Sequence, residues 1–294
     1  MIVKHNLSLK PYNSYRVDAI AATVYFPETN EDVVSLYGPD FGGRRKLLLG
    51  GGYNVVLTQP YYKEEIFIII DDHFSTTKVK PAPDTVDYKL IYAQAGQNLK
   101  ALSKLALQHQ LTGLEYFLDI PGSFGGAIYM NAGSKGEDIC NMLDWARYLD
   151  ITTGQVHRRI ISSNDFGYRN SIFQDSKKLI VLDGELRLRV GDEEAIRSKM
   201  EGNMALRWDK QPRDFPNAGS VFKRPTGYYV GQLIEELGLK GHQIGGAAVS
   251  EKHAGFIINK DNATGADIQQ LILDVQRRVR EAYGVELEVE QQFF

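Results

Sequence analysis

The segment LLLGGGYNVVLT, residues 47–58, places three consecutive glycines between two apolar runs. Glycine is costly in a strand, because it loses more backbone freedom on folding than any other residue and packs no side chain. Chains keep glycine where a Cβ would prevent a backbone conformation or a close approach to another group. Since β-branched residues follow these glycines, the pattern predicts a turn between two strands and not a turn that opens a helix.

A second glycine-rich segment, residues 113–138, contains PGSFGG followed by MNAG. Successive N–H groups in such turns can converge on an anion, and asparagine side chains add donors. One such turn is equally consistent with a hairpin that binds nothing. Two of them, separated by a strand pair and a helix, favour two walls around one phosphate-bearing ligand, such as a nucleotide or a flavin.

The composition excludes several classes of protein. The 294 residues suggest two or three domains, and the net charge of −3 gives no electrostatic footprint for nucleic acid. No apolar run has the length of a signal peptide or a membrane span. The single cysteine, Cys140, excludes an internal disulfide and any multi-cysteine metal site. We therefore expect a cytoplasmic protein with no metal site, no membrane insertion and no obligate protein partner.

The apolar patterning predicts an α+β protein with mixed sheets. Runs rich in Val, Ile, Tyr and Phe predict strands at 23–27, 46–50, 54–58, 65–70, 88–96, 146–152 and 178–190. Helical spacing predicts helices at 30–38, 98–110, 191–210, 230–239 and 266–284. Asn30 is the expected N-cap of the first helix. The proline-containing stretch 211–220 is the expected domain boundary.

Three further segments carry chemically versatile side chains: FGYRNSIF (166–173), PNAGSVFKRP (216–225) and VSEKHAGFIIN (249–259). Taken one at a time, a structural interpretation is favoured for each. Arg169 fits an ion pair, Ser220 a turn residue, and His253 a satisfied histidine in the core.

In their order along the chain, however, the motifs resemble the UDP-N-acetylenolpyruvoylglucosamine reductases. The motifs are GGGYN, IPGSFGGAIYMNAGSKG, FGYRNSIF, NAGSVFKRP, GLKG, VSEKHAGFIIN and the terminal LEVE, and the resemblance runs from about Leu7 to Glu290. It implies a vanillyl-alcohol oxidase-type (PCMH-type) FAD-binding fold of two subdomains plus an α+β substrate-binding domain. The implied domains are an FAD-binding subdomain at 1–70, to which the tail 285–294 returns, a second FAD-binding subdomain at 71–207, and a UDP-sugar domain at 208–284.

The resemblance also implies which residues approach FAD. In the first turn these are Gly50, Gly51, Gly52, Tyr53 and Asn54. From the second subdomain they are Pro121, Gly122, Ser123, Gly126 and Ala127. Since the first glycine loop contains no histidine or cysteine, we expect FAD to be bound without a covalent link.

The implied reaction is the reduction of UDP-N-acetylglucosamine enolpyruvate to UDP-N-acetylmuramate, a step of peptidoglycan precursor synthesis. NADPH reduces FAD, and flavin N5 then delivers hydride to the enolpyruvyl group. Arg169 stabilises the charge that builds at the substrate carboxylate, and Glu290, which must hold or share a proton, hydrogen-bonds to the same group. Ser220 donates the proton to carbon. The expected substrate or cofactor contacts are made by Lys223, Asn217, Lys252 and His253.

Two departures from the family pattern stand out. Tyr53 replaces the serine of GGGSN, and LEVEQQFF replaces LEPEVR at the terminal element. The short spacing between Arg169 and Ser220 resembles the shorter subtype, which lacks an inserted tyrosine-bearing loop. Two alternatives stay open: an FAD oxidase or dehydrogenase acting on an alcohol or hydroxy acid, and a nucleotide-sugar-binding protein that has lost catalysis.

Overall fold

The computed structural model describes residues 1–294 and divides into two compact units. Unit 1 comprises residues 1–3, 25–51 and 67–206, and unit 2 comprises residues 4–24, 52–66 and 207–294. Four elements contain residues of both units: β1 (Ile2–Ser8), β2 (Ile20–Phe26), β5 (Tyr61–Ile69) and α5 (Glu193–Lys210). The chain therefore passes repeatedly from one unit to the other.

Unit 1 is built on a large antiparallel sheet in which β12, β11, β15, β7 and β6 are neighbours in that order, and β8 also pairs with β15. The strands are β3 (Lys46–Leu49), β6 (Thr77–Pro81), β7 (Tyr88–Gln94), β8 (Leu111–Thr112), β9 (Gly133–Ser134), β10 (Glu137–Asp138), β11 (Leu143–Asp150), β12 (Gln155–Ile160), β13 (Phe166–Gly167), β14 (Asn170–Ser171) and β15 (Leu179–Val190). The helices are α1 (Asn30–Leu36), α2 (Leu99–Gln108), α3 (Phe124–Met130) and α4 (Ile172–Ser176). Single 3₁₀ turns cover Pro39–Phe41, Asp72–Phe74, Glu115–Asp119, Ile139–Asn141 and Ser163–Asp165.

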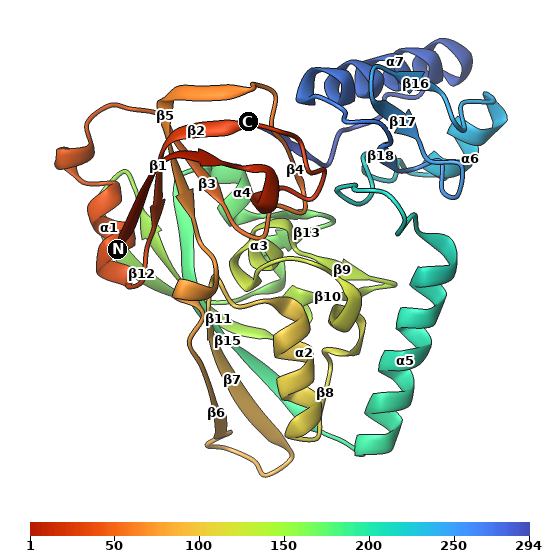
Figure 1. Ribbon diagram of the computed structural model, residues 1–294. Coiled ribbons are helices and arrows are strands. Elements are labelled where there is room, and N and C mark those ends of the chain that lie inside the picture. The colour runs from red at the N-terminus through yellow and green to blue at the C-terminus, as the bar shows by residue number, and fades with distance from the viewer. The chain divides into compact units, whose positions relative to one another are not determined.

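The central strand of this sheet, β15, is buried on both faces. Val181, Leu186 and Leu188 belong to the main core, which α2 and α3 cover from one side (Figure 1). Ile180 and Leu182 belong to a second cluster that includes Val33 of α1. Burial on both faces fits the continuous apolar run at residues 179–182. Farther along the strand, Asp183 and Glu185 are also buried, and they form ion pairs with Arg147 and Lys80.

The N-cap of α1 differs from the prediction, because Thr29 and not Asn30 caps the helix. The Thr29 hydroxyl accepts a hydrogen bond from the Asp32 N–H at 3.1 Å, and the Asp32 carboxylate accepts one from the Thr29 N–H at 3.1 Å. This reciprocal capping box satisfies two amides that the helix leaves unpaired. Asn30 was therefore the wrong choice by one position, since both residue types are good caps and only the acidic residue three positions on distinguishes them.

Unit 2 contains a three-stranded antiparallel sheet of order β16-β17-β18 and a two-stranded parallel pair, β19-β4. Its complete elements are β4 (Val55–Val56), β16 (Gln243–Ile244), β17 (Ala247–Val249), β18 (Ile257–Asn259), β19 (Gln292–Phe293), α6 (Val230–Glu236), α7 (Gly265–Tyr283) and a 3₁₀ turn at Lys10–Tyr12. Helix α7 begins with a capping box formed by Thr264 and Asp267 and ends at Gly284, which has a left-handed backbone. Its buried residues follow the helical period, as predicted.

The other predicted elements are found, with their ends shifted by a few residues. The expected strand 54–58 is reduced to the two residues of β4, which pair with the end of the chain. The turn at residues 50–54 joins strand β3 to strand β4, which confirms the prediction from its β-branched flank. None of the helices is both long enough and apolar enough to span a membrane.

Candidate functional site

The first glycine turn is held closely against the protein's own main chain. Gly52 is buried and has a φ of +70°, and a Cβ there would overlap the carbonyl oxygen of Tyr12. The N–H of Ser14 donates to the Gly52 carbonyl at 3.0 Å. Glycine is therefore required at position 52 by packing and backbone conformation, whether or not a ligand binds.

The two glycine turns meet within unit 1. A Cβ on Gly50 would overlap the hydroxyl of Ser123, so the side of the first turn lies directly on the start of the second. Gly51, between the two packed glycines, is exposed. The structure thus brings together two segments that the sequence suggested as neighbouring walls, and it leaves the middle glycine accessible.

The second turn is anchored on the β7–α2 connection. Ser123 is the N-cap of α3 and its hydroxyl accepts from the Gly126 N–H at 3.3 Å. The N–H groups of Phe124 and Gly125 donate to the carbonyls of Gln97 and Ala95 at 2.7 and 2.8 Å. These bonds fix the backbone of the turn, while Pro121 and Gly126 stay exposed.

Gly122 and Ala127 behave differently in the same turn. Gly122 has a φ of +143°, and a Cβ there would touch only a Leu99 methyl, so its need for glycine is conformational. Ala127 is 3% exposed and belongs to the core of unit 1. Its N–H donates to the Ser123 carbonyl at 2.9 Å and its carbonyl accepts from the Ala132 N–H at 2.8 Å, so both main-chain groups already have partners in the protein.

A buried hydroxyl beside the first turn fits a polar ligand. The Oγ atom of Ser14 is buried and has no hydrogen-bond partner, although the Ser14 N–H binds Gly52. An unsatisfied buried hydroxyl is unusual and calls for a partner that the protein does not supply. Together with the 43% exposed Tyr53 of the same unit, it fits a polar ligand at this turn. Ser14 was missed from the sequence, where it forms part of no motif.

In unit 2, hydrogen bonds join the segments that carry Ser220 and Glu290. The Glu290 N–H donates to the Val221 carbonyl at 2.8 Å, and Phe222 forms an antiparallel bridge with Val289. On its other side, Ser220 forms a bridge with Phe256. Ser220 and Glu290 therefore lie on adjacent extended segments, although they are far apart in the sequence. Ser220 is exposed and Glu290 is half-buried.

Asn54, the last residue of the first glycine motif, belongs to the same arrangement. Its side-chain amide donates to the Glu290 carbonyl at 3.1 Å, and its own carbonyl accepts from the Gln292 N–H at 2.9 Å. The side chain that was expected to add a donor for FAD therefore also fixes the main chain at Glu290. Asn54, Glu290 and the Ser220 segment form one connected group.

Two of the residues expected at the substrate have partners within unit 2. Lys223 forms an ion pair with Glu288, with 2.8 Å between Nζ and Oε1. The Asn217 amide donates to the Pro212 and Phe215 carbonyls at 2.8 and 3.0 Å, and its Oδ1 accepts from the Gly219 N–H at 3.1 Å. Asn217 therefore shapes the turn that leads into Ser220.

Lys252 and His253 are also engaged within the protein. The Lys252 ammonium donates to the Trp208 carbonyl at 2.8 Å. The His253 Nδ1 accepts from the Gly255 N–H at 3.1 Å, and its ring packs edge-on against Phe256 at 4.8 Å. Burial lowers the pKa of His253, which favours the neutral ring. This environment agrees with the structural interpretation of the histidine.

Arg169 lies in unit 1 at the turn between β13 and β14, with a φ of +52°. Its guanidinium donates to the carbonyls of Asn131 and Gly133, and it forms an ion pair with Asp138 at 3.2 Å. A left-handed backbone is unfavourable for a residue with a Cβ, and such strain is concentrated at functional sites. The two carbonyls and the Asp138 carboxylate fix the position of the guanidinium. The ion pair expected from the structural interpretation of Arg169 is thus present.

Asn131 connects this hairpin to helix α3 and was not assigned a role from the sequence. It is 3% exposed, ends α3 with a left-handed backbone, and donates from its side chain to the Gly167 carbonyl at 2.9 Å. The MNAG motif contains it, but the sequence does not show that its partner is the hairpin carrying Arg169.

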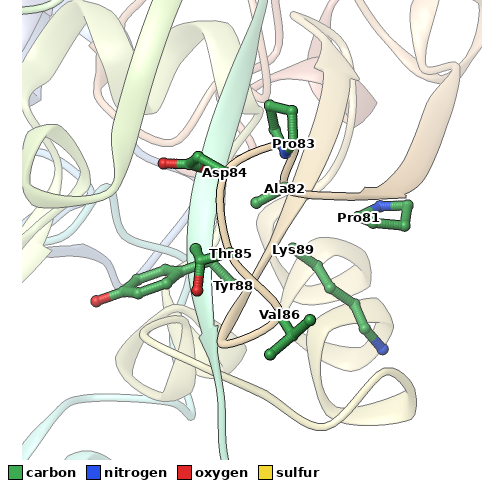
Figure 2. A pocket seen from close by; sticks show the side chains of 8 residues that line it. All are labelled: Pro81, Ala82, Pro83, Asp84, Thr85, Val86, Tyr88 and Lys89. Atoms are coloured by element: carbon green, nitrogen blue, oxygen red, sulfur yellow. The ribbon is translucent and has the colours of Figure 1, made fainter.

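Elsewhere in unit 1, the β6–β7 turn surrounds a hollow of about 450 Å³ (Figure 2). It is lined by Pro81, Ala82, Pro83, Asp84, Thr85, Val86, Tyr88 and Lys89. None of the residues predicted to act on a cofactor or substrate belongs to this set, so the hollow gives no support for a second candidate site.

Replacing Gly52 with alanine is expected to destabilise the protein more than the same change at Gly284. Both glycines are left-handed, at +70° and +67°, but only Gly52 faces a carbonyl oxygen, because nothing lies within 4 Å of a Cβ at Gly284. Gly284→Ala should cost about 1–2 kcal/mol for the backbone. Gly52→Ala should cost about 1–3 kcal/mol more. Urea unfolding measures the free energy of unfolding of both variants. An equal decrease in the two would contradict the packing argument.

Comparisons with known proteins agree with this geometry. A model of an FAD binding domain matches residues 21–159, and the C-terminal domain model of UDP-N-acetylenolpyruvoylglucosamine reductase matches residues 211–294. The UDP-N-acetylenolpyruvoylglucosamine reductase of Francisella tularensis is 35% identical over 97% of this chain and 98% of its own length. The protein of that name from Caldanaerobacter subterraneus is 39% identical over 96% of this chain and 90% of its own length.

A solved structure shows the same fold over the whole chain. The crystal structure of UDP-N-acetylenolpyruvylglucosamine reductase from Thermus caldophilus has a TM-score of 0.80 and 28% identity, and the match covers 100% of this chain and 99% of that one. The expected α+β fold class, the FAD cofactor and the assignment to the oxidoreductases are confirmed. The ordered motifs, the joined glycine turns and the matches over nearly the full length show that this chain belongs to the UDP-N-acetylenolpyruvoylglucosamine reductase family.

Proposed function

We propose that the protein uses NADPH to reduce the enolpyruvyl group of UDP-N-acetylglucosamine enolpyruvate, giving UDP-N-acetylmuramate for peptidoglycan precursor synthesis in the cytoplasm. The observation that supports it best is the connected group in unit 2. There, Asn54 binds the Glu290 carbonyl, and the Glu290 N–H binds the residue that follows Ser220. A proton donor and a carboxyl group on adjacent segments suit a reaction that adds a proton beside a carboxylate.

The two glycine turns would hold FAD by its diphosphate. The exposed main chain at Gly51 and Gly126 in unit 1 supports this assignment. The chemistry supplied by bound FAD is hydride transfer, from NADPH and then to the substrate. Since neither turn contains a cysteine or histidine, we propose that the cofactor is held without a covalent link.

Ser220 would give its hydroxyl proton to the substrate carbon that becomes basic after hydride addition. A hydroxyl is a weak acid at neutral pH, but a strongly basic carbanion makes a weak acid sufficient. Arg169 would stabilise the charge on the substrate carboxylate, with its guanidinium oriented by Asn131, Gly133 and Asp138. Glu290 would hydrogen-bond to the same carboxylate while holding a proton.

Lys223, Asn217, Lys252 and His253 stay predictions as substrate contacts. Lys223 is the strongest of them, because its side chain is 17% exposed and lies three residues beyond Ser220. The domain limits of 1–70 with 285–294, 71–207 and 208–284 also stay predictions. The family-model limits near residue 211 and the pairing of β19 with β4 support them.

Anaerobic titration of the purified holoprotein tests the proposal. NADPH is expected to bleach the flavin absorbance, and the enolpyruvyl UDP-sugar is expected to restore it while UDP-N-acetylmuramate forms. An alcohol oxidase would instead be bleached by its alcohol and restored by oxygen. A binding protein without catalysis would stay yellow in NADPH. Either of these results would overturn the assignment.

A further inference from the structure

A buried polar pair in unit 2 is not used by the proposed reaction. The Tyr15 side chain is fully buried and Gln291 is 3% exposed. The Tyr15 hydroxyl donates to the Gln291 Oε1 at 3.0 Å, although 276 residues separate the two in sequence. Burial raises the pKa of the Tyr15 hydroxyl, an effect that the hydrogen bond to Gln291 opposes, so the hydroxyl keeps the proton that it donates.

The amide nitrogen of the Gln291 side chain hydrogen-bonds to the turn that carries Ser220. Its Nε2 donates to the Ala218 carbonyl at 3.2 Å and lies 3.5 Å from the Ser220 carbonyl. These two carbonyls flank Gly219, which has a φ of +79° and nothing within 4 Å of a Cβ position. Glycine has the most backbone freedom of all residues. The Gln291 carboxamide contacts the carbonyls on both sides of Gly219 and so restrains the turn at this flexible position.

The same network reaches the start of the turn. The Asn259 side chain donates to the Tyr15 carbonyl at 2.8 Å, and the Asn259 N–H donates to the Pro216 carbonyl at 2.8 Å. Main chain and side chain of Tyr15 are therefore both fixed. The turn is held at Pro216 by Asn259, and at Ala218 by Gln291.

Gln291 is one of the residues at which this chain differs from the family pattern. LEPEVR places valine after the glutamate, whereas LEVEQQFF places Gln291 there. A buried carboxamide is costly unless its donors and acceptor are satisfied, and here Tyr15, Ala218 and Ser220 surround it. A fully connected polar group of this kind fixes one geometry more strictly than an apolar contact does.

We propose that Gln291, oriented by Tyr15, is a positioning residue that fixes the Ser220 turn for proton delivery. This inference rests on the proposed function. Gln291 acts through the main chain at Ala218 and Ser220 and need not touch the substrate. Because it directly follows Glu290, it also couples the position of the turn to that of the carboxyl-bearing segment.

The test uses the FAD-loaded protein and follows each half-reaction by stopped-flow absorbance. Gln291→Met keeps a similar length and removes the hydrogen bonds, and Tyr15→Phe removes a single oxygen. Gln291→Met is expected to leave flavin reduction by NADPH within about twofold. It should slow reoxidation by the enolpyruvyl substrate by up to about 100-fold, the effect of a displacement of roughly 1 Å. Tyr15→Phe should slow the same step less.

Double variants distinguish a specific effect on the position of Ser220 from a general destabilisation of the surrounding structure. In a Ser220→Ala background, Gln291→Met should add less than about twofold, because the group that it positions is absent. Equal slowing of both half-reactions, or an undiminished effect without Ser220, would overturn the proposal. If Gln291→Met fails to retain FAD, the same comparison with Tyr15→Phe decides.

The proposed function has a separate point of failure. Should Ser220→Ala alone leave reoxidation at its normal rate, Ser220 is not the proton donor, whatever Gln291 does. Should Ser220→Ala slow reoxidation while neither Gln291→Met nor Tyr15→Phe does, the function stands and the positioning role is wrong.

Discussion

Ser220→Ala is expected to leave flavin reduction by NADPH nearly unchanged and to slow reoxidation by the enolpyruvyl sugar by at least about 10²–10⁴-fold. NADPH oxidation requires no proton from Ser220, whereas the substrate carbon must acquire one after hydride addition. Single-turnover absorbance of the holoprotein, reduced first and then mixed with substrate, measures the two steps separately. The exposed position of Ser220 makes a folding defect in this variant minor.

Ser220→Cys is the matched control for the acidic proton. A thiol is a stronger acid than a hydroxyl and has nearly the same reach, so this variant should retain much more of the second half-reaction than alanine does. The assigned role would be wrong if cysteine and alanine were equally slow, or if either variant slowed both half-reactions by the same factor.

Arg169→Lys is expected to slow reoxidation by about 10²–10³-fold, the range found when one donor to a developing anion is lost. Lysine keeps the positive charge but not the planar fork that binds a carboxylate through two parallel hydrogen bonds. It also cannot bind the Asn131 and Gly133 carbonyls together in the geometry of the guanidinium. Reduction by NADPH should be nearly normal, and rapid mixing of substrate with the prereduced variant measures the loss.

Asp138→Asn separates catalysis by Arg169 from its structural ion pair. The change removes the charge that pairs with Arg169 at 3.2 Å and leaves the carbonyl contacts in place. Partly exposed ion pairs contribute little to stability, so we expect a small effect on both half-reactions. If Asp138→Asn were as slow as Arg169→Lys, the arginine would act mainly by maintaining the hairpin structure.

The sequence by itself determined the local elements, because their signals are local. Helix α7 could be predicted from its apolar period, and the turn at residues 50–54 from the β-branched residues that follow it. The prediction placed the cap of α1 one residue too late, where Thr29 and Asn30 compete and a single acidic side chain at Asp32 decides. The family and its cofactor followed from motif order over the whole chain.

Only the tertiary structure decided how distant residues support one another. Gly52 had to be glycine because of the Tyr12 carbonyl, and a Cβ on Gly50 would displace the Ser123 hydroxyl; no pattern in the sequence shows these contacts. Nothing in the sequence distinguishes Tyr15 or Gln291 from residues at the surface. In the fold, both side chains are buried and form a hydrogen bond with each other. Burial and hydrogen-bond partners depend on which segments pack together, and that choice is made by the whole chain during folding.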